Sequence, residues 1–410
     1  MAAIAEPTIA EPAIDLTDDR LAARNAVVLA VAQALSGGNN TVIAATTSII
    51  ASVLAPDATL ATLPISFMVA GMWLGTLPVG ALTKAYGRRF ALQTGSAFGI
   101  ASGLISCAAV LQGSFLLLLA GTFCGGLYAA AHQSYRFAAA DTASPKFRPK
   151  AVAWVLAGGV FAGVIGPQLV IYTKDIWPAY LFAATFIGQS ACAALAAIVL
   201  HFVKIPRPQV SHSLADGRPL TAIIVQPKFI VAVVCGLASY TMMNMMMTSA
   251  PLAMIMCHHS VGDAALGIQW HVLGMYAPSF ITGSLIARFG VRRMIAIGLA
   301  LIVVAASIEL AGVEIWNFWV GLTILGVGWN FAFISATTLV TECHDPHERN
   351  KVQAFNDFLI FGSMALGSFS SGALLARYGW TAVNDMAFPV IFIAAVLLAW
   401  GSLVRRPKAA

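Results

Sequence analysis

The sequence predicts an all-α integral membrane protein with twelve transmembrane helices in two pseudo-symmetric six-helix halves. Three observations lead to this fold class. Of the 410 residues, 59% are hydrophobic and only 10% are charged, whereas soluble domains carry about 25% charged residues. The apolar residues form segments long enough to cross a bilayer, and motifs at the ends of these segments recur in the second half of the chain.

The N-terminal half follows a polar stretch. Residues 1–25 are net acidic and lack the basic n-region of a secretory signal peptide, so we expect a disordered cytoplasmic tail. A membrane-crossing helix needs about 20 mostly apolar residues. Residues 26–202 contain six such segments, at 26–53, 60–83, 90–112, 114–139, 151–173 and 178–202.

The C-terminal half begins after a polar, proline-containing stretch. We interpret this stretch, residues 203–228, as a cytoplasmic linker between the halves. Residues 229–403 contain six further segments, at 229–256, 264–287, 293–313, 317–340, 352–375 and 382–403. Residues 404–410 form a short basic tail that we also place in the cytoplasm.

The positive charges predict the orientation. Lys and Arg concentrate on the cytoplasmic side of membrane proteins. With both termini in the cytoplasm, all of the 23 Lys and Arg residues except Arg136, Lys174 and Arg377 fall in cytoplasmic segments. The net charge of +6 therefore reflects the loops between spans, and nucleic acid is not an expected partner; the lipid bilayer is.

Two loop motifs occur once in each half. Gly80 and the later Gly87-Arg88-Arg89 recur as Gly283 and Gly290-Val291-Arg292-Arg293. After the fourth and tenth segments, a second motif recurs, as Asp141, Pro145, Arg148 and Lys150 and then as Glu342, Pro346, Arg349 and Lys351. Parallel six-helix repeats are typical of one large transporter architecture. Over its whole membrane region the chain resembles the major facilitator superfamily, although Lys84 and Ala287 replace the acidic residue of its loop motif.

The sequence contains no sign of an enzyme. It has no GxxxxGK[ST] phosphate-binding loop, so ATP hydrolysis is not expected, and no nucleophile–base arrangement stands out. The six cysteines are scattered and suggest no disulfide framework. We predict a secondary transporter without a cofactor.

Polar side chains inside the spans are candidates for a substrate site, because they are costly in a membrane and transporter sites lie near the bilayer midplane. Asn39 and Asn40 lie at the centre of the first span, and Tyr240 and Asn244 lie at a similar depth in the seventh. The alternative for the asparagines is hydrogen bonding between helices. His132, in the fourth span, is a candidate carrier of a coupling proton.

Methionines crowd the seventh span, which holds half of the chain's 14. Met243 and Met247 share one helix face by their i, i+4 spacing, and His271 and Met275 repeat this spacing on the eighth span. If the two spans are antiparallel neighbours, these four side chains would form two pairs at matched depth in the membrane, Met243 with Met275 and Met247 with His271. Three thioethers and an imidazole suit Cu(I), whereas the alternative is ordinary core packing.

Cysteine and histidine flank this cluster. Cys257, His258 and His259 follow the seventh span at its periplasmic mouth, where they could capture a soft metal ion. Cys235 lies on the opposite, exit side of the cluster. A disulfide between the two cysteines is excluded, because 22 residues of helix span about 33 Å.

The paired motifs Met243-xxx-Met247 and His271-xxx-Met275, with Cys235 and Cys257, resemble those of the CcoA-like copper importers. The resemblance implies copper import across the bacterial inner membrane, in support of haem–copper oxidase assembly. Copper would then be the transported substrate, and copper donor and acceptor chaperones would be partners. The alternative is a carrier of a flavin-like or drug-like organic solute, with or without proton coupling. Aromatic and amide side chains would then line the site and the methionines would be packing residues; the lining residues would be Tyr128, Tyr240, Trp270, Trp329, Asn39 and Asn244.

Overall fold

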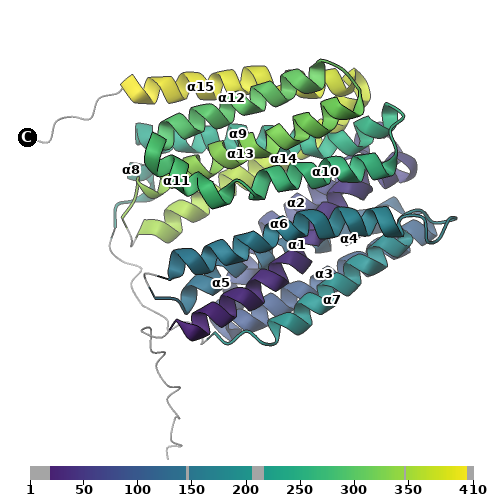
Figure 1. Cartoon of the computed structure of the whole chain (residues 1–410), viewed down its shortest axis with the longest axis horizontal. Helices are drawn as coiled ribbons and strands as arrows, with labels where there is room; N and C mark the ends of the chain where they lie inside the picture. The colour runs from purple at the N-terminus through teal and green to yellow at the C-terminus, as the bar shows by residue number, and fades with distance from the viewer. Residues whose placement is uncertain (1–18, 145–146, 206–216, 346–347, 404–410) are drawn as a thin grey trace, which may run out of the picture.

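The structure is a computed structural model of the whole chain, and it describes residues 19–144, 147–205, 217–345 and 348–403. Within these ranges every regular element is a helix. Figure 1 shows two helical bundles lying one above the other, the N-terminal half in purple to teal and the C-terminal half in teal to yellow. The all-α membrane fold predicted from the sequence is therefore confirmed.

The N-terminal bundle contains the first six predicted spans. Its fourth span is split at Ser134 into α4 and α5, and a short 3₁₀ helix, η1 (Ala58–Leu60), lies between the first two spans. The bundle's helices are α1 (Arg20–Leu54), α2 (Leu63–Tyr86), α3 (Arg88–Gln112), α4 (Phe115–Gln133), α5 (Tyr135–Asp141), α6 (Arg148–Thr173) and α7 (Ala183–Leu200).

The C-terminal bundle contains the other six predicted spans. A short helix, α8 (Leu220–Ile224), precedes α9 (Pro227–Met256). The eighth span is broken into α10 (Val261–Tyr276) and α11 (Ser279–Phe289), and Pro278, which has no backbone N–H to donate, lies at the break. The remaining helices are α12 (Val291–Leu310), α13 (Ile315–Thr341), α14 (Arg349–Asp385) and α15 (Ala387–Leu403).

Ten helical segments of the described chain are long and apolar enough to cross a membrane. One of them, Lys351–Leu403, contains both α14 and α15. The broken pair α10 and α11 is not among the ten, because each piece is too short alone. Counting α14 and α15 separately and adding the broken pair accounts for the twelve predicted spans.

The first helix begins earlier than predicted, at Arg20 rather than residue 26. Asp19, directly before it, accepts hydrogen bonds from the backbone N–H of Ser144 at 2.9 Å and from its hydroxyl at 2.7 Å. This contact ties the start of α1 to the segment after α5. The rest of the predicted tail, residues 1–18, lies outside the described residues, as do linker residues 206–216 and the C-terminal residues 404–410.

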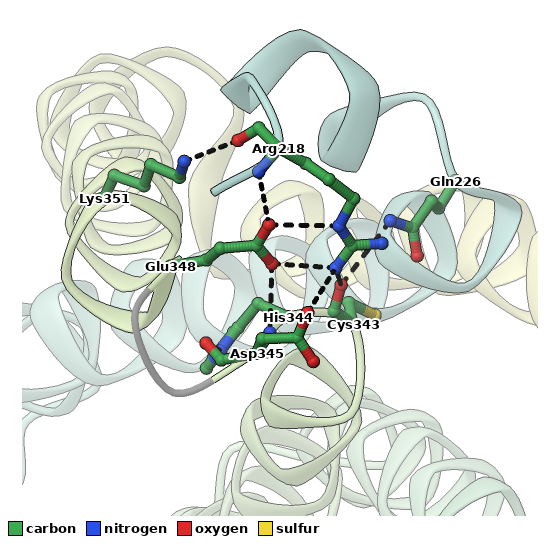
Figure 2. Close-up of polar contacts among 7 residues, drawn as sticks. All are labelled: Arg218, Gln226, Cys343, His344, Asp345, Glu348 and Lys351. Carbon is green, nitrogen blue, oxygen red and sulfur yellow. Dashed lines mark hydrogen bonds and ion pairs between the residues drawn. The ribbon is translucent and has the colours of Figure 1, made fainter. Parts of the chain in front are cut away.

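The C-terminal half has an equivalent contact where the linker re-enters the fold (Figure 2). Arg218 donates to the two carboxylate oxygens of Glu348, from Nε at 3.0 Å and from Nη2 at 2.7 Å. Its backbone N–H adds a third bond to Glu348, at 2.7 Å. These donors hold the pKa of the Glu348 carboxyl well below its usual range. Each half thus fixes the segment before its first long helix to the loop after its fourth span.

The two halves are joined most firmly at the end of the molecule that carries the loop between α1 and α2. There Thr62 Oγ1 donates to the Ser368 carbonyl at 3.2 Å, and the Ser66 and Ser368 hydroxyls lie 3.1 Å apart. Gln168 on α6 donates to Gln269 on α10 at 2.8 Å. We call this the joined end and the opposite one the termini end.

Packing is looser toward the termini end. Most of the buried residues of α2 lie in its first half, and Thr282 is the one buried residue of α11 within the described chain. A methyl group added at Gly80 or Gly283 would contact nothing within 4 Å. The halves therefore meet tightly on one side of a central site and loosely on the other.

Candidate functional site

A cavity of about 100 Å³ lies between the two halves, near the middle of the molecule. Both bundles contribute its walls, through α1, α2, α4, α6, α9, α10 and α14. Its polar and aromatic lining residues are Gln33, Asn40, Thr41, His132, Gln133, Tyr240, Asn244 and Tyr276, and its thioethers are Met68, Met72, Met243, Met247, Met275 and Met364. No Asp, Glu, Lys or Arg is among the described residues that line it.

The two adjacent asparagines of α1 have different surroundings. Asn40 lines the cavity, whereas Asn39 is buried behind it. Asn39 Nδ2 donates to the Gly125 carbonyl at 3.3 Å, and its Oδ1 accepts a 2.7 Å bond from Gln189. Asn39 therefore links α1 to α4 and α7, and only Asn40 is placed to meet a solute.

The α9 wall presents Tyr240, Met243, Asn244 and Met247, which share one helix face by their i, i+3/i+4, i+7 spacing. Asn244 is also fixed from behind, because its Nδ2 donates to the Met364 carbonyl of α14 at 3.2 Å. The wall is thus polar at Asn244 and apolar around it.

Tyr240 is held in place by aromatic rings of α13. Its ring meets those of Trp329 and Phe333 edge-on, with centroids 5.2 Å and 4.8 Å apart. Trp329 and Phe333 stack on each other at 5.2 Å. Such packing restricts the phenol ring and presents a rigid aromatic surface to the cavity.

His132 lines the cavity from α4 and is only 5% exposed. Neither ring nitrogen has a hydrogen-bond partner among the described residues. The rings of Tyr128 and Tyr135 flank it, with centroids 6.0 Å and 6.2 Å away. A buried polar group normally has a partner, so His132 is available to hydrogen-bond a solute.

The α6 wall is built for close contact with the other half. A methyl group at Gly163 would lie 2.8 Å from Cγ1 of Val272 on α10, and one at Gly159 would lie 3.2 Å from the Tyr276 ring. Glycine at these positions lets α6 and α10 pack closely and brings Tyr276 to the cavity wall.

The four predicted copper ligands do not converge on the cavity. Met243, Met247 and Met275 line it, but His271 is absent from the lining and fully buried. His271 donates from Nδ1 to the Leu322 carbonyl at 2.8 Å, so its ring turns toward α13. His271 and Met275 are spaced i, i+4 but face different neighbours, because Met275 lines the cavity whereas the imidazole faces α13 rather than α9.

None of the predicted entry and exit residues is among the described residues that line the cavity. Cys235 is buried, and its thiol donates to the Ala394 carbonyl of α15 at 3.7 Å. His259 hydrogen-bonds the Val313 carbonyl at 2.7 Å, while Cys257 and His258 follow the end of α9. Within the described ranges no three His, Cys, Asp or Glu side chains are grouped to hold a metal ion.

Several lining residues were not predicted from the sequence. They are Gln33, Thr41, Met68, Met72, Gln133, Tyr276 and Met364. Gln33 lies two helical turns before Asn40, and Met68 and Met72 are spaced i, i+4, so helical periodicity could have grouped them once one residue of each face was known. Nothing in the sequence indicates which face of α2 or α14 meets the other half.

Comparison with known proteins now identifies the architecture. A family model described as Major Facilitator Superfamily matches residues 29–277 and 232–410. A bacterial homologue of the lysosomal transporter Spinster, solved in an inward-facing conformation, aligns with a TM-score of 0.69 at 16% identity over 96% of this chain and 100% of its own. The D-xylose-proton symporter aligns with a TM-score of 0.70 at 15% identity over 91% of this chain and 96% of its own.

Among curated proteins, the riboflavin transporter RfnT of Brucella anthropi is 44% identical over 387 residues, which cover 93% of this chain and 97% of RfnT. This similarity overturns the predicted copper import, with its metal binding and its role in oxidase assembly, and the resemblance to CcoA-like importers is not supported. The physical reason for the error is that thioethers serve as soft ligands and as apolar packing groups alike. Here they form part of an apolar wall.

Proposed function

The chain belongs to the major facilitator superfamily, and from that premise we propose that it is a secondary carrier of an uncharged, flavin-like organic solute, with riboflavin as the first candidate. The 44% identity to a riboflavin transporter over nearly the whole chain supports this solute class. The observation that carries the proposal is the cavity lining, which contains amides, aromatic rings and thioethers but no formal charge among its described residues.

An uncharged lining favours an uncharged solute. A charge buried away from water is costly unless an opposite charge or a dense set of hydrogen bonds compensates it. Riboflavin is neutral, with a flat tricyclic ring and a polyhydroxyl chain. Tyr240 and the thioethers suit the ring, because sulfur and aromatic groups pack favourably on aromatic faces. Asn40, Asn244 and the other amides suit the hydroxyls and ring carbonyls.

The size of the cavity implies a conformational change. Its volume is about 100 Å³, whereas sites for drug-sized ligands usually measure about 300–1,000 Å³. The site must therefore enlarge to admit a flavin. Since the halves are hydrogen-bonded at the joined end and loosely packed at the termini end, we expect enlargement to begin at the termini end, as alternating access requires.

The termini end is assigned to the cytoplasm in this proposal. The chain has the architecture of a multi-pass membrane transporter, and its Lys and Arg residues concentrate in the loops of that end. In a bacterium this topology corresponds to the inner membrane. We propose no catalytic step, because transport by this architecture needs only the exchange of two conformations.

The decisive experiment is uptake of radiolabelled riboflavin by a bacterial riboflavin auxotroph that lacks its own importer. Cells that express this chain should accumulate riboflavin and grow at micromolar external concentrations, and cells with an empty vector should not. A tenfold excess of unlabelled riboflavin should block the uptake, whereas flavin mononucleotide should compete poorly because its phosphate is charged.

Two controls make the result interpretable. Membrane levels of the protein are measured in the same cells, so that absent uptake is not mistaken for absent protein. Copper accumulation is measured in parallel and should equal that of the empty vector. A well-expressed chain that leaves riboflavin uptake at the vector level would refute the proposed function.

A further inference from the structure

A second, larger cavity lies far from the solute site, as an open groove between α12 and α15 in the C-terminal half. Its volume is about 1060 Å³. The walls are formed on α12 by Arg292, Arg293, Ala296, Leu299, Ala300, Val303 and Val304, and on α15 by Phe388, Pro389, Ile391, Phe392, Ala395, Leu398, Ala399 and Ser402. None of these residues lines the cavity between the halves.

The groove is long, and apolar side chains form most of its walls. Lining positions on both helices follow i, i+3, i+4 and i+7 spacing, so each helix contributes one continuous stripe. Small side chains in the middle of both stripes leave room for an occupant: Ala296 and Ala300 on α12 and Ala395 and Ala399 on α15. The shape suits an extended hydrocarbon chain rather than a compact solute.

One end of the groove is strongly basic. Arg292 and Arg293 are exposed at the start of α12, and Ser402 lines the same end from α15. Neither arginine has an ion-pair partner among the described residues, and the lining contains no carboxylate to neutralise them. Two unpaired guanidinium groups beside an apolar channel are complementary to an anionic headgroup with acyl chains.

The length of the groove matches one leaflet. From Arg292 to Val304 the helix rises about 18 Å at 1.5 Å per residue. Half of a bilayer's hydrocarbon core measures about 15 Å. An acyl chain of one leaflet would fill the channel while its phosphate lies level with the arginines.

From these features we propose that the groove between α12 and α15 is a binding site for an anionic phospholipid of the leaflet at the termini end. Its phosphate is held by Arg292 and Arg293, and an acyl chain lies over the alanines. A zwitterionic lipid fits less well, because its cationic amine would lie beside two guanidinium groups. The site is separate from the solute cavity and does not depend on what the carrier transports.

The test uses the full-length chain, purified in a mild detergent and delipidated. Binding of phosphatidylglycerol and of phosphatidylcholine with identical acyl chains is titrated by native mass spectrometry. Wild-type protein should bind its first phosphatidylglycerol at least tenfold more tightly than phosphatidylcholine. Since a basic residue near anionic lipid contributes roughly a fivefold gain in affinity, Arg292→Gln and Arg293→Gln together should abolish this preference.

A second pair of variants separates the groove from general surface charge. The double variant Arg24→Gln/Lys84→Gln removes two exposed charges from the same end of the molecule but outside the groove, and it should keep the preference. Ala300→Phe fills the channel and should weaken binding of both lipids severalfold. Size-exclusion profiles and melting temperatures confirm that each variant is folded.

Three outcomes would overturn the proposal. The first is an unchanged lipid preference in Arg292→Gln/Arg293→Gln. The second is an equal loss of preference in the Arg24→Gln/Lys84→Gln control, which would show a diffuse charge effect. The third is a wild-type dimer that Ala300→Phe dissociates, because the groove would then be covered by a second copy of the chain.

Discussion

Tyr240 on α9 meets Trp329 on α13 edge-on, with the ring centroids 5.2 Å apart. The contact fixes an aromatic ring of the cavity wall from behind, and no hydrogen bond from the Tyr240 hydroxyl is found among the described residues. If the aromatic ring of Tyr240 contacts the solute, the ring contributes more to solute binding than the hydroxyl does. Replacing Tyr240 by Phe, which keeps the ring, and by Ala, which removes it, should therefore have different effects on transport.

Tyr240→Phe should keep riboflavin uptake within about twofold of wild type, whereas Tyr240→Ala should lower it at least tenfold, because a buried aromatic contact is worth roughly 0.5–1.5 kcal/mol beyond its area. Initial uptake rates over a range of riboflavin concentrations provide the measurement. Trp329→Phe serves as a control that preserves an aromatic support. Equal uptake by Tyr240→Ala and wild type would remove Tyr240 from the site.

The neighbours Asn39 and Asn40 offer a matched pair. Asn39→Ala should lower thermal stability, since it leaves Gln189 without the acceptor it uses at 2.7 Å, and losing one partner of a buried hydrogen bond costs about 1–3 kcal/mol. Asn40→Ala removes an acceptor that Asn39 uses at 3.1 Å, but Asn39 keeps its bond to the Gly125 carbonyl, so this variant should lower the melting temperature less than Asn39→Ala does and should raise the KM for riboflavin. Thermal denaturation of purified protein and concentration-dependent uptake measure the two effects. The reverse pattern would contradict the assigned positions.

The thioethers should behave as packing groups. Met243→Leu and Met247→Leu conserve volume closely, and such swaps usually cost less than about 1.5 kcal/mol. Riboflavin uptake by each variant should therefore stay within about threefold of wild type. A polar substitution at the same place, Met247→Gln, should reduce uptake more strongly. Uptake at constant expression checks both, and a tenfold loss in the leucine variants would show a role specific to sulfur.

The fold could be predicted from the sequence because few backbone structures are stable across a membrane. Spanning segments must be long, apolar and hydrogen-bonded within themselves, so apolar runs and the repeated motifs at Gly80 and Gly283 indicate twelve helices in two halves. Boundaries were less well predicted. The early start of α1 depends on a contact between Asp19 and Ser144, which are distant in sequence.

The site could be predicted only in part. Tyr240, Met243, Asn244 and Met247 share a face by helical periodicity, and all four line the cavity. Periodicity does not say which neighbouring helix receives a side chain, and His271 accordingly turns to α13. Nor does it distinguish a thioether that binds metal from one that packs against a solute, which is why the copper interpretation was wrong.

The ion pair between Arg218 and Glu348 predicts a pH-dependent contribution to stability (Figure 2). The pKa of Glu348 is lowered in the folded chain, mainly by the hydrogen bonds from Arg218. A carboxyl with a lowered pKa stabilises the fold fully above its ordinary pKa of 4.5, and this stabilisation is lost as the pH falls through the folded value. Glu348→Gln should therefore melt below wild type at pH 7, and the gap should narrow below about pH 4.

Differential scanning fluorimetry of the purified proteins between pH 3 and pH 8 measures this gap. Asp345→Asn is the matched control, because Asp345 is exposed and lies 4.0 Å from the Arg218 guanidinium, outside the close bidentate contact. Its effect at pH 7 should be much smaller, as expected for an exposed ion pair. A Glu348→Gln gap that stays constant with pH would show that the carboxylate charge is not responsible.

The joined end of the molecule predicts a cross-link that stops transport. The hydroxyls of Ser66 and Ser368 lie 3.1 Å apart and come from different halves, so Ser66→Cys and Ser368→Cys place two thiols close enough for a disulfide. A carrier must separate its halves at each end in turn, and a covalent bond here holds one end shut. Oxidation should therefore reduce riboflavin uptake by the double variant at least tenfold, and dithiothreitol should restore it.

Each single-cysteine variant is the control and should transport riboflavin under both oxidising and reducing conditions. Undiminished uptake by the cross-linked double variant, with the disulfide verified by mass spectrometry, would show that the joined end need not open during transport.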